Sequence, residues 1–107
     1  MYEINGTKIK LTKGDTFETI VGIKQGEEDY TPVEGDSVRF ALKQNYEDKD
    51  PLINKSIPID TLLLRLESSD TKTLEPGKYV YDIEITKASG DVDTFISDVL
   101  TLTPEVH

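Results

Sequence analysis

Apolar and polar residues alternate with a period of two along much of this chain, and the alternation narrows the choice of fold more than any other feature. In the segment 36–43, Val38, Phe40 and Leu42 share one face, while mainly hydroxyl and charged side chains occupy the other. The segment 77–86 repeats the pattern with tyrosines and isoleucines. Successive side chains of a strand point to opposite faces, so the pattern is typical of half-buried antiparallel strands.

Turn-forming residues separate these runs at regular intervals. Asn5-Gly6 favours a two-residue hairpin turn, because both residues tolerate positive φ, and further glycine and proline turns follow. The predicted strands are 7–12, 16–24, 36–43, 52–57, 61–66, 77–86 and 93–102. Seven short strands predict an all-β fold, an immunoglobulin-like antiparallel β-sandwich that residues 1–107 form as a single domain. The core is predicted to contain Phe17, Val21, Val38, Phe40, Leu64, Leu74, Tyr81 and Ile83.

The region from residue 60 to residue 81 carries the strongest local signals. The segment 60–68 is predicted as a strand with Leu62, Leu64 and Leu66 inward, although Asp60 could also cap a short helix there. Serine and aspartate at 68–70 favour one helical turn before the strand 77–86, and Pro76-Gly77 turns the chain into that strand. A tyrosine so soon afterwards indicates a tyrosine corner, whose hydroxyl bonds the preceding crossover. An ordinary core tyrosine after a proline–glycine turn explains the pattern equally well.

The last predicted strand has more apolar residues than one inward face can use. They fall on both parities: Phe95, Ile96, Val99, Leu100 and Leu102. The strand is therefore either buried on both faces or shifted in register by a bulge near Asp98. The N-terminal segment 2–11 can cover part of the excess; otherwise Phe95 and Val99 form an interaction patch for another subunit. Leu52–Ile57 is predicted to be an edge strand, because a lysine and a following proline guard it.

The net charge of −9, from 21 acidic and 12 basic residues, limits the classes of partner. Affinity for nucleic acid and anionic membranes comes largely from Lys and Arg, so we expect the chain to bind neither. No apolar run approaches the roughly 20 residues of a membrane span, and the N-terminus shows no hydrophobic signal segment. The absence of cysteine excludes disulfides, thiolate catalysis and cysteine-ligated metal.

Sequence patterns for catalysis or metal binding are missing. The one histidine is His107 at the C-terminus, and neither a Rossmann nor a P-loop glycine motif occurs. Asp91–Asp93 and Glu47–Asp50 come nearest to a calcium site, and neither matches an EF-hand loop. A carboxylate pair for glycoside hydrolysis would have no tryptophan beside it to stack on a sugar. We therefore expect no enzyme, no cofactor, and no catalytic, cofactor-binding or metal site residues.

Four stretches, taken in order, resemble a family of phage proteins. They are KIKLTKGDT at 8–16, GDSVRFALK at 35–43, LEPGKYVY at 74–81 and LTLTP at 100–104. The order is similar to the N-terminal domain of phage baseplate upper proteins, in which a Gly-Asp opening leads into alternating strands and a Pro-Gly-x-Tyr strand. The resemblance covers nearly the whole chain. It implies an immunoglobulin-like fold, a place in the virion tail or baseplate, and no catalysis.

Two functions from different classes follow as hypotheses. The first is a non-catalytic structural or interaction module of a bacteriophage or prophage tail. Such a module would be made in the host cytoplasm and would contact itself or other tail proteins. We expect either a weak homo-oligomer or assembly only with a tail partner. The alternative is an extracellular bacterial immunoglobulin-like domain that binds a carbohydrate or a host protein through its end loops, 25–32 and 44–51.

Overall fold

The computed structural model describes residues 2–5, 7–25 and 28–104, and most of the regular structure in them is β-strand. The strands are β1 (Tyr2–Asn5), β2 (Lys8–Thr12), β3 (Phe17–Ile20), β4 (Lys24–Gln25), β5 (Glu28–Asp29), β6 (Ser37–Lys43), β7 (Ile53–Ile57), β8 (Leu63–Leu66), β9 (Gly77–Thr86) and β10 (Val92–Thr103). The short helix α1 (Ser68–Thr71) follows β8. In these described ranges no helix is long and apolar enough to cross a membrane.

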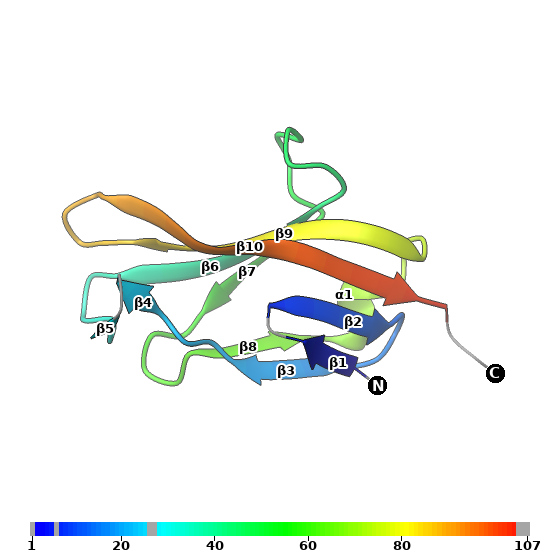
Figure 1. The fold of residues 1–107 in the computed structure, drawn as a ribbon, viewed down its shortest axis with the longest axis horizontal. Coiled ribbons are helices and arrows are strands. Elements are labelled where there is room, and N and C mark those ends of the chain that lie inside the picture. The colour runs from blue at the N-terminus through cyan, green and yellow to red at the C-terminus, as the bar shows by residue number, and fades with distance from the viewer. Residues whose placement is uncertain (1, 6, 26–27, 105–107) are drawn as a thin grey trace.

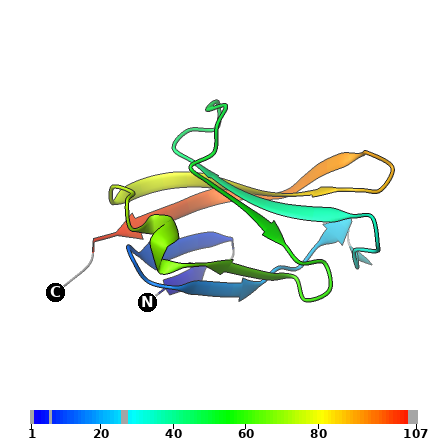
Figure 2. The same cartoon turned by 180° about the vertical axis from the view of Figure 1, so that it is seen from behind.

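Two sheets form the layers of a sandwich (Figures 1 and 2). Six strands make the large sheet in the order β1–β2–β10–β9–β6–β7, β3 pairs with β8 in the second sheet, and β4 pairs with β5 in a small hairpin. In Figure 1 the β1–β2 end of the large sheet curls toward β3. The predicted immunoglobulin-like β-sandwich is confirmed. The parallel pairing of β2 with β10 was not part of the prediction, which expected antiparallel strands.

The core lies between the two sheets. Alternation turns the even residues of β6 and the odd residues of β9 inward, and Phe40 stacks on Tyr81 with ring centroids 5.5 Å apart. Phe17 and Leu64 close the core from the second sheet, because both are buried. The predicted core is confirmed for Phe17, Val21, Val38, Phe40, Leu64, Tyr81 and Ile83. Leu74 is the exception, since it is half-buried and packs against the core from outside.

Each predicted strand has a counterpart, with shorter bounds at some ends. The strand expected at 16–24 pairs with β8 over Phe17–Ile20. One further bond follows, from the Val21 backbone N–H to the Leu62 carbonyl, and the pairing ends there because Leu62, with a φ of 54°, is not in a strand conformation. In 60–68 the strand prediction is right for Leu64 and Leu66, which are buried in β8, and wrong for Leu62, which precedes the strand and is half-buried. The helix alternative is wrong, since α1 begins at Ser68. β7 is the terminal strand of the large sheet, as expected. β1, β4 and β5 were not predicted, because runs this short barely show an alternation.

A tyrosine corner joins α1 to β9, so of the two interpretations of this stretch the tyrosine corner is confirmed. The Tyr79 hydroxyl donates a hydrogen bond to the Glu75 carbonyl, across the Pro76-Gly77 turn. At the same end of the sandwich, the buried hydroxyl oxygen of Thr71 accepts the backbone N–H of Gly14 at 2.9 Å. Gly14 has a φ of 84°, which glycine adopts without strain. α1 therefore fastens the turn between β2 and β3.

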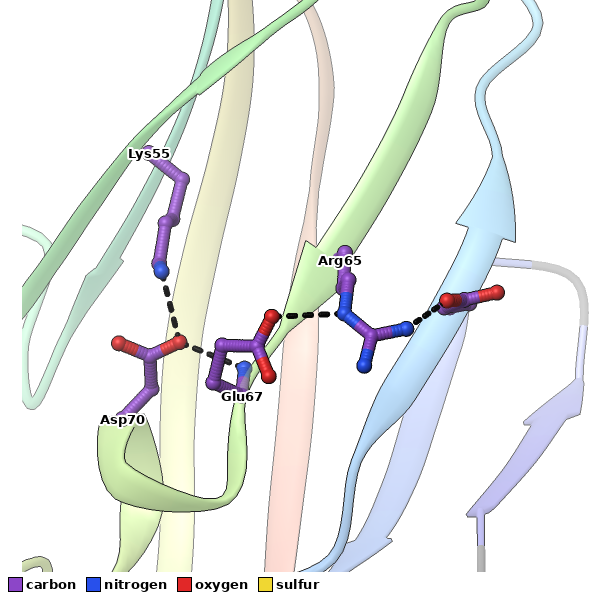
Figure 3. Close-up of polar contacts among 5 residues, drawn as sticks. Lys55, Arg65, Glu67 and Asp70 are labelled. Atoms are coloured by element: carbon purple, nitrogen blue, oxygen red, sulfur yellow. Dashed lines mark hydrogen bonds and ion pairs between the residues drawn. The ribbon is translucent and has the colours of Figure 1, made fainter.

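Charged side chains join α1 to the strands beside it (Figure 3). Asp70 accepts the backbone N–H of Glu67 at 2.7 Å, which satisfies a free donor at the helix start. The same carboxylate pairs with the Lys55 ammonium of β7 at 2.8 Å. Arg65 of β8 pairs with Glu67 at 2.7 Å and with Glu18 of β3. Exposed pairs such as the two that Arg65 makes contribute about 0–1 kcal/mol each, so they orient the start of α1 more than they stabilise the fold.

Candidate functional site

β10 is longer than the strand that covers its outer edge. β9 pairs with β10 from Val92 to Leu102, whereas β2 pairs with it from Leu100 to Thr103. The cover ends near Leu100 because β2 begins at Lys8 and the preceding strand, β1, pairs with the other side of β2. Among the residues the structure describes, no strand pairs with Val92–Asp98 on the side away from β9. We call this segment the β10 edge. Outward N–H and C=O groups on such an edge are able to pair with another strand.

Asp98 lies at the junction where β2 ceases to cover β10. Its carboxylate accepts hydrogen bonds from the Thr7 hydroxyl, from the Val99 backbone N–H at 2.7 Å and from the Lys8 ammonium at 3.2 Å. The Thr7 bond, followed by the Val99 bond and the contact with Lys8, holds the pKa of Asp98 below its ordinary value, although partial burial opposes the shift. One end of the β10 edge is therefore marked by a fixed negative charge.

Tyr81 of β9 lies opposite Asp98 and shares its face of the sheet. The Tyr81 hydroxyl donates a hydrogen bond to the Thr7 carbonyl, which ties the residue before β2 to β9. Burial, and then the charges of Asp98 and Tyr46, raise the pKa of Tyr81 to about 12. The phenol is therefore protonated at neutral pH and serves as a permanent donor. Asp98 consequently faces inward, beside an aromatic side chain of the core.

A β-bulge interrupts β10 between Thr94 and Ile96. Ile96 lies opposite Ile83, and Phe95 is the extra residue with no partner in the register. Both Phe95 and Ile96 are half-buried and pack against the core. The bulge explains how Phe95 and Ile96, two successive residues, both contact the core, and it lies at Phe95 rather than near Asp98, where the sequence pattern had suggested it.

The structure does not bring the predicted patch residues Phe95 and Val99 together. The bulge leaves Phe95 packed against the core, whereas Val99 lies opposite Val80 of β9. Val80 sits between the buried residues Tyr79 and Tyr81, so it and Val99 point to the outer face of the large sheet. The two side chains therefore belong to different surfaces, and a contact of either one with a partner stays a prediction.

An apolar cleft of about 240 Å³ lies between the β10 edge and β3, in the gap between the two sheets. Ile9 and Ile96 line it from the large sheet, and Ile20 and Val21 line it from the β3 side. Ile20 is 73% exposed, a high value for a large apolar side chain. Gly22 also lies in the wall, where an added Cβ would meet no atom within 4 Å. Position 22 therefore has room for a larger side chain at the wall of the cleft.

Two features of the β10 edge discourage unselective pairing. Soluble proteins guard sheet edges with bulges and inward-pointing charges, and here the bulge at Phe95 and the inward carboxylate of Asp98 supply both. Asp93, and Asp91 in the preceding turn, are exposed and add like charge near the hairpin end. A strand that pairs here must fit the bulge and tolerate the acidic groups, so these features restrict the partner.

Sequence reasoning pointed to β10 but missed the cleft. Ile20 and Gly22 approach Ile96 through the packing of two sheets, and no local pattern encodes that approach. Asp98 did carry a signal, because it shares its parity with the inward leucines that follow it in the strand. Inward-pointing charges are one of the devices that guard sheet edges, so this residue indicates where β10 lacks a covering strand.

The acidic segments weighed for calcium are not gathered into a metal site. Within the described ranges no group of three or more acidic, histidine or cysteine side chains could hold a metal ion. Asp48 accepts the backbone N–H of Asn45 at 3.0 Å, which closes the turn after β6. Asp91 and Asp93 are exposed in the β9–β10 hairpin. His107 lies outside the described residues.

Comparisons with known proteins correct the predicted family. No family model matches the chain, and no curated protein matches it. Among solved structures the chain is similar to CopC from Methylosinus trichosporium OB3b, with 14% sequence identity, a TM-score of 0.41, and coverage of 69% of this chain and 72% of that chain. A likeness this distant carries no argument about function. These findings give no match to phage baseplate upper proteins, so the predicted resemblance is wrong. The motifs behind it were not specific, because alternating strands and proline–glycine turns occur in many β-sandwich families.

Proposed function

We propose that this domain is a non-catalytic interaction module that binds another protein by accepting an extended segment along the β10 edge. One observation carries the proposal. In the described chain no strand pairs with Val92–Asp98 on the side away from β9, and an apolar cleft lies beside this segment. Added strands gain affinity from main-chain hydrogen bonds and specificity from pockets that receive alternate side chains. The β10 edge and the cleft offer these two kinds of contact side by side.

Contacts at both ends of the β10 edge support the proposal, because a fixed binding surface loses less conformational entropy on association. At the β2 end, Asp98 bonds the Thr7 hydroxyl and the Lys8 ammonium. At the hairpin end, Asp36 accepts the Ala88 backbone N–H at 3.2 Å, so the turn after β9 is tied to the loop before β6. A strand that docks between these points meets a pre-ordered edge.

A second candidate is ligand binding through the loop 44–52 between β6 and β7, which projects away from the sheets in Figure 1. Tyr46 is 52% exposed and Leu52 is 48% exposed on this loop. An exposed aromatic ring offers a rigid apolar face with a polar tip to a sugar or a protein. Screening the protein on a glycan array tests this candidate. Binding that Tyr46→Ala abolishes, while Tyr46→Phe retains it, would favour the loop over the β10 edge.

The remaining expectations stay predictions. The virion tail as location depended on a family resemblance that the comparisons overturn, so nothing now supports it. Weak self-association, the absence of enzymatic activity, and the absence of binding to nucleic acid or membrane are not tested by the fold. Each can be measured on the purified protein, and self-association bears directly on the partner argued for below.

A displayed library of random linear peptides, selected on the purified protein, tests the proposed function. We expect enriched peptides to protect backbone amides of the β10 edge from hydrogen exchange. β7 is the matched control, because it is a terminal strand of the same sheet, and its amides should exchange as in the free protein. Enrichment of no peptide, or protection confined to other parts of the domain, would contradict strand addition at β10.

A further inference from the structure

We infer that the segment accepted by the β10 edge inserts one apolar side chain into the cleft beside Ile96 and carries Lys or Arg close to it. The inference rests on the proposed function and specifies its partner, an extended cationic and apolar segment of a different protein. Three observations support it: the track that β2 follows on β10, the size of the cleft, and the charge around the β10 edge.

β2 shows how a strand on this side of β10 places its side chains. Ile9 and Leu11 lie beside Leu100 and Leu102 in the parallel register, and all four are buried. A strand in line with β2, continuing past the β1–β2 turn, would run beside Ile96, which forms part of the cleft wall. Because strand side chains alternate between the two faces, every second side chain of the added strand would point into the gap between the sheets.

The cleft has the size and lining for a side chain. Its volume of about 240 Å³ falls below the roughly 300–1,000 Å³ of typical small-molecule pockets. Its polar wall residues are Thr7, Thr19 and Tyr81, and the Tyr81 hydroxyl already donates to the Thr7 carbonyl. A polar ligand would find few free partners there, whereas an aliphatic or aromatic side chain would bury apolar area.

The charge around the β10 edge favours a cationic segment. Asp91 and Asp93 are exposed near the hairpin end, and at the other end Asp98 is inward and bonded to Lys8 at 3.2 Å. The whole chain carries a net charge of −9. Lys or Arg near Asp91 and Asp93 would gain Coulomb energy and faster association, while Glu or Asp would be repelled. Asp98 adds little to this attraction, because it is already paired with Lys8.

The same charges argue against a second copy of this chain as the occupant. Antiparallel pairing of two β10 edges would place Asp93 of one copy near acidic groups of the other, and like charges opposed across strands are destabilising. The bulge at Phe95 would interrupt the new ladder in both copies. A different chain with complementary charge avoids the repulsion.

The peptides enriched from the random linear library test the chemistry of the partner. We expect them to alternate apolar residues and to contain Lys or Arg. Gly22→Leu should place a large apolar side chain at the wall of the cleft without strain, because Gly22 lines the cleft and has open space and no left-handed φ. Affinity for the peptides, measured by fluorescence anisotropy, should fall by about tenfold or more, as when an anchor residue is lost. Gly22→Ala is the matched control and should bind within about twofold of wild type.

A charge-matched pair of variants separates local from global electrostatics. Asp93→Lys should weaken binding of the cationic peptides by about fivefold at low salt, with a smaller effect at high salt. Asp50→Lys changes the net charge equally but lies on the loop between β6 and β7, so the affinity should stay near that of wild type. Equal losses in the two variants would mean that no local charge at the β10 edge selects the partner.

The outcomes distinguish failure of the inference from failure of the proposed function. If no peptide is enriched, both are overturned. If peptides protect the β10 edge but bind Gly22→Leu and Gly22→Ala equally, strand addition stands and the anchor in the cleft is wrong. Enrichment of acidic peptides overturns the cationic partner. A concentration-dependent dimer in sedimentation, with the β10 edge protected, would show that a second copy is the occupant.

Discussion

Asp36 connects the loop before β6 with the turn after β9 through one nearly buried carboxylate. It is 8% exposed and accepts the Tyr30 hydroxyl at 2.6 Å, the Val33 backbone N–H at 3.1 Å and the Ala88 backbone N–H at 3.2 Å. The Tyr30 bond, followed by the Val33 bond, holds the pKa of Asp36 below its ordinary value, while burial opposes the shift. The charged form of this residue is therefore the one that the native state prefers.

Asp36→Asn should reduce the dependence of stability on acid pH. A carboxyl whose pKa is lower in the folded than in the unfolded state stabilises the native state above its unfolded pKa, and this contribution is lost as the pH falls through the folded pKa. The free energy of unfolding of the wild type should therefore decrease as the pH falls below 3.8, the ordinary pKa of an aspartate carboxyl. The variant should be less stable than wild type at neutral pH, and its free energy of unfolding should decrease less as the pH is lowered. Urea unfolding at several pH values measures this pH dependence. The same decrease in unfolding free energy at acid pH in both proteins would contradict the role of Asp36.

Phe40→Ala should be strongly destabilising, because Phe40 is fully buried and stacks on Tyr81. Truncation of a core phenylalanine costs about 3–5 kcal/mol, a large part of the roughly 5–15 kcal/mol that stabilises a domain. Ile20→Ala is the control, since Ile20 is 73% exposed and should cost far less. Denaturant midpoints measure both, and similar midpoints for the two variants would show that Phe40 is not central to the core.

At the scale of elements, period-two alternation succeeded where a strand has one inward face along its whole length. β6 and β9 fit this description, and their predicted phase agrees with the observed burial. β10 does not, because the bulge at Phe95 lets two successive side chains contact the core. The cleft beside β10 was beyond sequence reasoning, since it depends on where β3 packs relative to β10 and on how far β2 extends. The free edge exists because β2 is shorter than β10. Strand ends are predicted from a sequence pattern only to within a few residues, so this difference in length could not be predicted.

The crossover from α1 to β9 should depend on the tyrosine corner. Tyr79→Phe removes the hydrogen bond to the Glu75 carbonyl and leaves the ring in place. We expect a loss of about 0.5–1.5 kcal/mol in the free energy of unfolding, the usual net contribution of one such bond. Tyr46→Phe, an exposed position, should cost almost nothing. Hydrogen exchange should accelerate around residues 75–79 in Tyr79→Phe, and unchanged exchange there would argue that the bond is not formed in solution.

At the scale of the whole molecule, the net charge of −9 should govern solubility. Carboxylates lose charge as the pH falls toward the sequence pI of about 4.5, so repulsion between molecules weakens there. Solubility should therefore pass through a minimum near that pH and be high at neutral pH. Precipitation assays across this range, with added salt as a second variable, measure the effect. Greater solubility at the pI than at pH 7 would contradict a repulsive acidic surface.

The parallel pairing of β2 with β10 also sets an order in time. Ile9 and Leu11 pair with residues near position 100. During synthesis these two residues therefore have no pairing partner in β10 until almost all of the described chain has been made. The β9–β10 hairpin closes locally and early, whereas joining distant strands carries the larger entropic cost. Pulse-labelled hydrogen exchange should therefore show β9 amides protected before those of β2. A ribosome paused before β10 would expose these two aliphatic side chains, and unfinished chains would then be the form most prone to aggregate.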